Sequence, residues 1–316
     1  MCGIVGGTSE RNILPILVEG LRRLEYRGYD SAGVAFKKNG TISITKNKGR
    51  VEQLAKKLNL KENQSNLGIA HTRWATHGIP SEKNAHPHAS KNIFVVHNGI
   101  IENHNELKAQ LKAEGIRFST QTDTEVIAHL IKTYTEKGQS FEKAVFNTIK
   151  KLKGAYALGI LDKNDPEQVI GVRNQSPLVL GKGFQENFIA SDVMALSPVT
   201  NKFVYLDDGQ VALLNHHKTV VKNASNQTVR VKTHEVDSNA YTTDLQGHNH
   251  FMEKEIFEQP AAVKDSIEGR LTKNETQEGI FGAGFENAVK DITNIQIVAC
   301  GTSYHSARIF EFWSHK

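Results

Sequence analysis

The cysteine at position 2 is the residue of this 316-residue sequence best suited to covalent chemistry. If Met1 is removed, which a small second residue permits, the thiol and a free α-amine belong to the same residue. The amine then serves as general base for the thiol, as in other N-terminal nucleophiles. An α-amine with a pKa of about 7.7 to 8.0 and a thiol with a pKa of about 8.5 both titrate near neutrality. Cys2 is therefore a candidate nucleophile; its alternative role is a buried cysteine at the start of a core strand.

Asn98 and Gly99 follow the apolar run 93–97 and offer two donors to a developing negative charge. The Asn98 side-chain amide and the Gly99 backbone N–H would form an oxyanion hole when a thiolate attacks an amide carbonyl. Glycine also lets the backbone approach a substrate closely. The structural alternative is a two-residue hairpin turn, for which Asn-Gly after an apolar run is typical.

Arg73 and Asp123 are charged residues whose roles the pattern leaves open. The guanidinium of Arg73 suits the α-carboxylate of a free amino acid, because it binds a carboxylate through two parallel hydrogen bonds; otherwise Arg73 is a surface arginine. Asp123 falls in a predicted capping box, in which Thr122 caps a helix and Glu125 is its third residue.

Five histidines lie within 27 positions and raise a metal site as a rival interpretation: His71, His77, His86, His88 and His97. The region has no cysteine near it and no H-E-x-x-H, and its spacings match no standard zinc pattern. We therefore expect no metal and no cofactor, and we assign His88 and His97 to loop or core packing.

Composition restricts the class of protein further. Lysine and arginine exceed the acidic residues by 39 − 34 = +5, and the basic residues are scattered, which suits small anions better than nucleic acid. Only two cysteines occur, which excludes a disulfide framework. No apolar run approaches the roughly 18 residues of a membrane-spanning helix, and the amino terminus has no signal core. We expect a cytoplasmic protein that binds neither nucleic acid nor membrane.

The pattern of short β-rich runs and helical periods predicts an α+β layered domain over residues 1–237. The expected helices are centred on 14–24, 126–134 and 144–152. The expected strands are 3–7, 32–37, 41–46, 67–71, 93–97, 155–161, 168–173, 178–182, 187–190, 203–206 and 210–214.

A polar stretch without periodicity predicts a linker at 238–249 and a second, incomplete domain at 250–316. Helices are expected at 251–258 and 261–271. The apolar run 295–299 predicts a buried strand that leads through Gly301 into a helix, with Cys300 packed in the strand. One such unit cannot cover its own apolar faces, so we expect this domain to be truncated.

The motifs around these residues resemble the class II glutamine amidotransferases, a family of N-terminal-nucleophile hydrolases. Five segments carry the resemblance in order: Met1-Cys2-Gly3-Ile4-Val5-Gly6, 25–33 (EYRGYDSAG), 71–78 (HTRWATHG), 97–103 (HNGIIEN) and 122–125 (TDTE). The resemblance implies a four-layer αββα sandwich. It also implies hydrolysis of glutamine to glutamate and ammonia through a thioester on Cys2.

The resemblance assigns roles to residues that spacing alone does not. Asn98 and Gly99 would form the oxyanion hole, and Asp123 would pair with the α-ammonium of glutamine. Thr76, His77 and His86 would line the glutamine pocket. Trp74 would screen the intermediate and gate ammonia, and Arg27 would buttress the site.

The segment Val298-Ala299-Cys300-Gly301-Thr302-Ser303-Tyr304 resembles the first phosphate-binding loop of sugar isomerase (SIS) domains, although alone it is also an ordinary strand-to-helix turn. Thr302 and Ser303 would then contact a sugar phosphate. This order of domains implies fructose 6-phosphate as the ammonia acceptor and a homodimer, formed through the missing region, in the complete enzyme. Three alternatives stay open: an amidotransferase of the same class with another acceptor, a non-catalytic sugar-phosphate-binding module, and a metal-binding protein built on the histidines.

Overall fold

The computed structural model describes residues 2–236, 247–267 and 289–314. Contacts divide the chain into two units, Met1–Thr243 and Asp244–Lys316. The predicted linker at 238–249 lies mostly outside the described residues.

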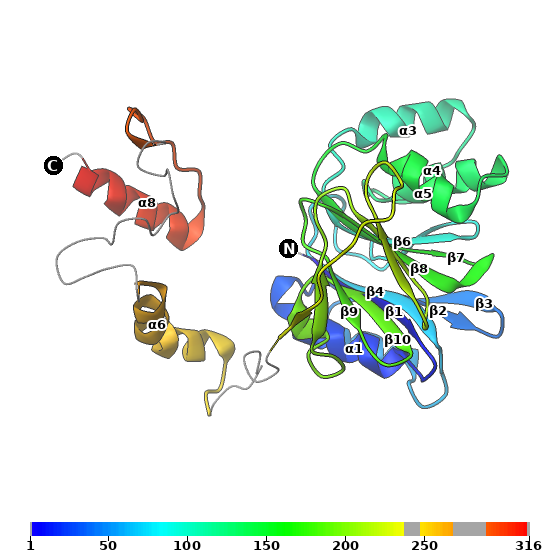
Figure 1. Cartoon of the computed structure of the whole chain (residues 1–316), viewed down its shortest axis with the longest axis horizontal. Helices are drawn as coiled ribbons and strands as arrows, with labels where there is room; N and C mark the ends of the chain where they lie inside the picture. Colours follow the sequence, from blue (N-terminus) through cyan, green and yellow to red (C-terminus); the bar gives the residue numbers. More distant parts are fainter. Residues whose placement is uncertain (1, 237–246, 268–288, 315–316) are drawn as a thin grey trace. The chain divides into compact units, whose positions relative to one another are not determined.

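Two antiparallel sheets form the centre of the first unit (Figure 1). The eight-stranded sheet has the order β14-β11-β9-β10-β1-β4-β2-β3, and the six-stranded sheet has the order β13-β12-β8-β7-β6-β5. The strands of the larger sheet are β1 (Gly3–Ser9), β2 (Ser31–Lys38), β3 (Thr41–Lys48), β4 (Leu67–Arg73), β9 (Val179–Lys182), β10 (Glu186–Ala190), β11 (Lys202–Tyr205) and β14 (His234–Glu235). Those of the smaller sheet are β5 (His88–Ser90), β6 (Ile93–Gly99), β7 (Tyr156–Asp162), β8 (Asp165–Asn174), β12 (Val211–Leu214) and β13 (Thr219–Lys222).

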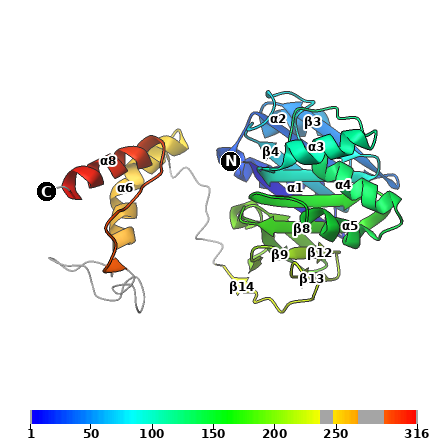
Figure 2. The same ribbon diagram turned by 90° about the horizontal axis from the view of Figure 1, so that it is seen from above.

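Helices cover the outer face of each sheet, which gives four layers (Figures 1 and 2). The helices on the larger sheet are α1 (Leu14–Arg23) and α2 (Val51–Leu58), with the short helices η1 (Glu25–Arg27) and η2 (Val193–Ala195) beside them. Those on the smaller sheet are α3 (His104–Ala113), α4 (Glu125–Glu136) and α5 (Phe141–Ile149). The αββα sandwich expected from the sequence is confirmed.

The alternation of side chains along the strands explains this layering, because successive residues of a strand face opposite sides of its sheet. On β1, Ile4 packs between the two sheets, whereas Val5 packs under α1. On β4, Ile69 likewise packs between the two sheets, and Ala70 packs on the helix-covered side of the larger sheet. Strands that are apolar on both faces are therefore buried on both faces, which places the start of β1 in the interior of the sandwich.

Each strand predicted over residues 3–214 coincides with an observed strand, and the three helices predicted there are also present. The sequence analysis missed α2, α3, β5, β13 and β14, which are short or largely polar. The predicted capping box is wrong: α4 begins at Glu125, and the Glu125 carboxylate accepts hydrogen bonds from Ser119 and Thr120. Ser119 and Thr120 lie in the loop before the helix. They therefore occupy the Glu125 carboxylate, which in a capping box would accept from the N-cap residue.

The second unit departs from its predicted pattern. A single helix, α6 (Phe251–Ile267), passes through Pro260 in place of two helices, and Leu271 lies outside the described residues. The run 295–299 forms no strand, and Val298 is 88% exposed. A strand requires a neighbour to accept its hydrogen bonds, and the described part of this unit contains no other strand. Helix α8 (Gly301–Ser314) begins where the helix was expected.

Among the described residues, no helix is both long and apolar enough to cross a membrane.

Candidate functional site

The candidate nucleophile lies at the start of the strand at the centre of the larger sheet. Cys2 immediately precedes β1, and β1 pairs with β4 so that Gly3 faces Thr72. This register places the Cys2 thiol against the end of β4, where Sγ accepts a hydrogen bond from the Trp74 backbone N–H at 3.2 Å. Burial raises the pKa of the Cys2 thiol. The thiol is therefore protonated at neutral pH and needs a base to become a nucleophile.

The Asn98 amide reaches Cys2 from the other sheet. Asn98 lies near the end of β6, and its Nδ2 donates to the Cys2 carbonyl at 3.0 Å and to Ser191 Oγ at 2.8 Å. Both hydrogens of Nδ2 are thus engaged next to the nucleophile. An oxyanion bound by Asn98 has to replace one of these two acceptors.

Ser191 is a site residue that sequence analysis missed. It directly follows β10, it is buried, and its Oγ accepts a second hydrogen bond from the Ile4 backbone N–H at 2.8 Å. Its own N–H donates to the Ile4 carbonyl at 3.0 Å. Ser191 therefore ties the nucleophile strand to Asn98. A single serine after a strand belongs to no recognisable sequence motif. The role of Ser191 becomes visible only in the structure, where β10 pairs with β1.

A chain of buried side chains holds the other end of the Asn98 amide. His71 Nε2 lies 3.0 Å from both Asn98 Oδ1 and the His97 carbonyl, and His71 Nδ1 lies 3.1 Å from His86 Nδ1. His86 Nε2 lies 2.8 Å from Thr124 Oγ1, which lies 2.9 Å from His97 Nδ1. The chain thus runs from Asn98 to the residue before α4.

Chemistry fixes the direction of these hydrogen bonds when the histidines are neutral. The His97 carbonyl only accepts, so His71 Nε2 carries the hydrogen and donates to it and to Asn98 Oδ1. His71 Nδ1 then accepts from His86 Nδ1, and His86 Nε2 accepts from the Thr124 hydroxyl. Because Asn98 Oδ1 is held as an acceptor, its NH₂ group must face Cys2.

Burial supports the neutral state of the histidines. Desolvation lowers the pKa of His71 to about 3 and the pKa of His86 and His88 well below their usual value. It also lowers the pKa of His97. His88 and His97 are buried, as the packing role expected for them requires. His86, expected in the glutamine pocket, has both ring nitrogens hydrogen-bonded within the protein, so contact with a ligand through either nitrogen would break one of these bonds.

Arg73 carries an unpaired donor. It is 3% exposed, its Nη2 donates to the carbonyls of His77 and Gly78, and its Nη1 is buried with no hydrogen-bond partner among the described residues. A buried guanidinium nitrogen without an acceptor is costly. The arrangement therefore fits an anionic ligand, such as a carboxylate.

Asp123 is also buried, and its Oδ2 accepts from the Ile101 N–H at 2.9 Å. A carboxylate has more acceptor positions than one such bond uses. Between Asn98 and Ile101, Gly99 has a φ of 119°, and a Cβ there would lie 2.0 Å from the Ala155 carbonyl oxygen. Glycine is therefore required at position 99 by the backbone itself.

The other predicted site residues surround this centre. Thr76 is exposed and His77 half-buried in the loop after β4, and the indole of Trp74 is 51% exposed and meets the Tyr29 ring edge-on. Arg27 lies on η1, where its guanidinium pairs with Asp192, the residue after Ser191. Gly28 packs against the backbone of Arg73 and Trp74, where a Cβ would come within 2.8 Å.

The residues expected to bind a sugar phosphate lie in the second unit. Thr302 and Ser303 are exposed in the first turn of α8. Cys300, expected to pack inside a strand, is exposed. That expectation is wrong because the strand that would bury it is absent.

The buried histidines predict that the protein loses stability on mild acidification. Their pKa values are lower in the folded state than the value of about 6.5 in the unfolded chain, so the unfolded chain binds protons first. Their contribution is complete above pH 6.5 and declines below it by about 1.4 kcal/mol per pH unit for each histidine. We expect urea unfolding, followed by far-UV circular dichroism, to show a lower free energy of unfolding at pH 5.5 than at pH 7.5.

The pair His216 and His217, of which the first is half-buried and the second exposed, provides the control: neither belongs to the buried histidine chain, so replacing both by glutamine should leave the fall in stability in place. A free energy of unfolding that is the same at both pH values would contradict the neutral histidine chain.

Comparison with known proteins places this geometry in context. The family model for the glutamine amidotransferase domain matches residues 58–253. The chain is 46% identical over 314 residues to glutamine–fructose-6-phosphate aminotransferase (isomerizing) of Shewanella oneidensis, covering 99% of this chain and 52% of the relative. It is 48% identical over 313 residues to the protein of the same name from Acinetobacter baylyi, covering 99% and 51%. The chain thus spans about half the length of these relatives.

Solved structures show the same fold. Glutamine phosphoribosylpyrophosphate amidotransferase from B. subtilis, complexed with ADP and GMP, superimposes with a TM-score of 0.62 and 26% identity, over 72% of this chain and 50% of that one. The first unit, with a cysteine beside an asparagine amide from the facing sheet, belongs to the same structural class. The chain belongs to the glutamine amidotransferase domain family.

Proposed function

We propose that this chain hydrolyses glutamine to glutamate and ammonia, with Cys2 as nucleophile. The observation that carries the proposal is the buried, unpaired Nη1 of Arg73, in the residue before the one whose backbone contacts the Cys2 thiol. A free amino acid supplies a carboxylate for this nitrogen. Its side chain can then extend toward the thiol.

The proposed reaction begins once Met1 has been removed. The Cys2 α-amine takes the thiol proton, which the raised pKa of the thiol would otherwise retain at neutral pH. Sulfur attacks the carboxamide carbon, and the C=O electron pair moves to oxygen, where Asn98 and the Gly99 N–H stabilise it. The pair returns, the C–N bond breaks, and the ammonium of Cys2 gives its proton to the departing nitrogen. Water then hydrolyses the glutamyl thioester.

The remaining predicted residues bind and enclose glutamine in this proposal. Asp123 pairs with the α-ammonium, while Thr76 and His77 line the pocket and Trp74 screens it from solvent. Ser191, His71 and His86 position Asn98 without touching substrate. Arg27 holds the Asp192 segment and, through it, Ser191.

We further propose that the ammonia serves fructose 6-phosphate, as the name of the relatives states for those proteins. Thr302 and Ser303 at the start of α8 would take part in binding the sugar phosphate. On this proposal the complete enzyme is a cytoplasmic homodimer, and the described residues by themselves perform the glutaminase step only.

Covalent capture tests the nucleophile. We expect an electrophilic glutamine analogue to add one equivalent to protein that lacks Met1, as measured by intact-mass spectrometry. Cys2→Ala should abolish the adduct, and Cys300→Ala, which removes the only other thiol, should keep it. Adduct formation by Cys2→Ala, or full activity in protein that retains Met1, would rule out the proposed mechanism.

Substitution of Arg73 tests the recognition of the α-carboxylate. We expect Arg73→Lys, which keeps the charge but not the two-pronged geometry, to raise KM for glutamine more than it lowers kcat. Glutamine amide, which lacks the carboxylate, should be a poor substrate for the unaltered chain and should lose little further with Arg73→Lys. Equal losses on both substrates would show that Arg73 does not bind this group.

Substitution of Asn98 should lower kcat for glutamine hydrolysis more than substitution of Ser191. Removing an oxyanion donor by Asn98→Ala should lower kcat for glutamine hydrolysis by about 10² to 10³. Ser191→Ala should lower kcat by less, with KM unchanged, because it removes an acceptor for the Asn98 amide and for the Ile4 N–H but leaves the oxyanion donor itself in place. Ser197→Ala, which removes a hydroxyl bonded to the Met194 carbonyl, is the control. If Ser191→Ala behaves like Ser197→Ala, Ser191 does not position Asn98.

A further inference from the structure

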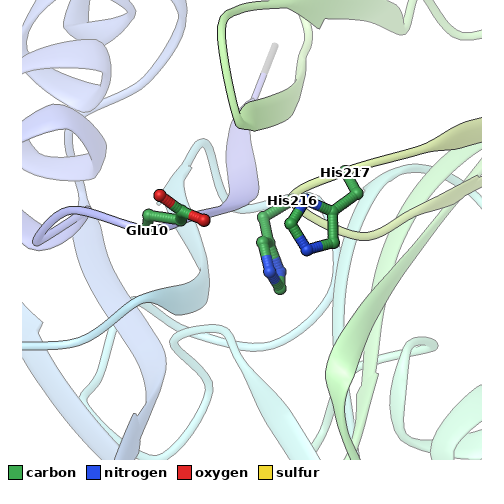
Figure 3. Close-up of side chains that lie close together, drawn as sticks. All are labelled: Glu10, His216 and His217. Carbon is green, nitrogen blue, oxygen red and sulfur yellow. The ribbon is translucent and has the colours of Figure 1, made fainter.

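Three potential metal ligands meet at the end of the first unit opposite the nucleophile. Glu10 follows β1, and His216 and His217 lie in the turn between β12 and β13 (Figure 3). One ligand atom from each of the three side chains lies within 4.8 Å of the other two. The two imidazole rings are 3.9 Å apart. The site therefore combines a carboxylate from the larger sheet with two imidazoles from the smaller sheet.

Buried hydrogen bonds hold the histidine turn in place. Asn187, on β10 and 6% exposed, donates from Nδ2 to the Asn215 carbonyl at 2.7 Å and to the His216 carbonyl at 3.4 Å. Asn215 Oδ1 accepts from the N–H groups of His217 and Lys218 at 3.0 and 2.7 Å. Because Asn187 pairs with Thr8 of β1, the turn is fastened beside the strand that carries Glu10.

The side-chain atoms that would coordinate a metal ion are available for binding. Within the described part of the chain, the ring nitrogens of His216 and His217 make no hydrogen bond, and Glu10 takes part in no ion pair. The neighbouring Arg11 is directed away, because its guanidinium binds Glu186 through two bonds of 2.8 Å. Gln185 lies beside the Glu10 carboxylate, and with its amide turned so that the nitrogen faces Glu10 it would donate to that carboxylate and leave further lone pairs free.

We propose that Glu10, His216 and His217 bind a divalent transition metal ion, with Zn²⁺ the best match. Two neutral imidazoles and a carboxylate form a known three-ligand set for zinc, with water as the fourth ligand. Ligands at 2.0 to 2.1 Å from a tetrahedral ion lie about 3.3 Å from one another. Binding thus requires the ligand atoms of these partly exposed side chains to approach one another by up to about 1.5 Å.

The ion would join the two sheets at a point remote from the reaction. Cys2 and Glu10 flank the two ends of β1, eight residues or about 26 Å apart at the rise of a β-strand. The site therefore acts on the stability of the sandwich and leaves the glutaminase step unchanged. The inference stands independently of the proposed function.

The experiment uses untagged chain with Cys2→Ala and Cys300→Ser, so that no thiol competes for the ion. We expect calorimetric titration with ZnCl₂ at pH 7.5 to show one equivalent bound. The double variant His216→Ala/His217→Ala should lose this binding, and Glu10→Gln should weaken it by about tenfold or more, as loss of ligand geometry does elsewhere. His234→Ala, which removes an exposed histidine from β14, should bind like the parent.

Two further readouts separate a built site from surface adsorption. Co²⁺ should give the intense visible bands of a tetrahedral complex in the parent and not in the double variant. Binding should weaken as the solution is acidified, because protons and the metal ion compete for the same ligand atoms. Absence of a one-equivalent site in the parent, or equal affinity in the parent and the double variant, would overturn the proposal.

Discussion

The Asn98 side-chain amide is the point at which the two sheets of the sandwich become one site. Its NH₂ group bonds the Cys2 carbonyl and the Ser191 hydroxyl on the larger sheet, while its oxygen accepts from His71. Asn98 itself belongs to the smaller sheet. A primary amide has chemically distinct ends, so the interface is satisfied in one orientation only. The proposed nucleophile and the proposed oxyanion donor are aligned by this one constraint.

The buried polar groups around Asn98 are costly, and their mutual hydrogen bonds compensate for that cost. Histidine inside a protein is tolerable when it is neutral and paired. Here the chain from His97 through Thr124 and His86 to His71 gives each link a donor and an acceptor, except for His97 Nε2, which is buried and has no partner in the described part of the protein. A protonated histidine in this chain would carry a charge away from water, which is costly. The orientation of Asn98 is therefore coupled to the charge state of these buried histidines.

The Nη1 of Arg73, which has no hydrogen-bond partner among the described residues, differs from the paired atoms of this network. Where the histidine chain supports the fold and the oxyanion donor, Arg73 leaves one donor buried and open. A fold under selection for stability alone would pair or remove such a group. Because Arg73 lies next to the residue whose backbone contacts Cys2, it is the feature that most directly favours a ligand with a free carboxylate, such as that of an amino acid, over a neutral amide.

The sequence by itself determined the layered class, the strands over 3–214 and the candidate nucleophile, because these depend on local patterns: period-two alternation, helical spacing and a cysteine at position 2. It also singled out Asn98, Gly99, Arg73 and Asp123 as chemically suited residues. Only the tertiary structure identified Ser191 and placed His86 beneath the site, because both roles arise from strand pairing and sheet packing between residues far apart in sequence. The predicted capping box and the strand at 295–299 failed for the same reason, since local propensity cannot say which partner takes a carboxylate or whether a neighbouring strand exists.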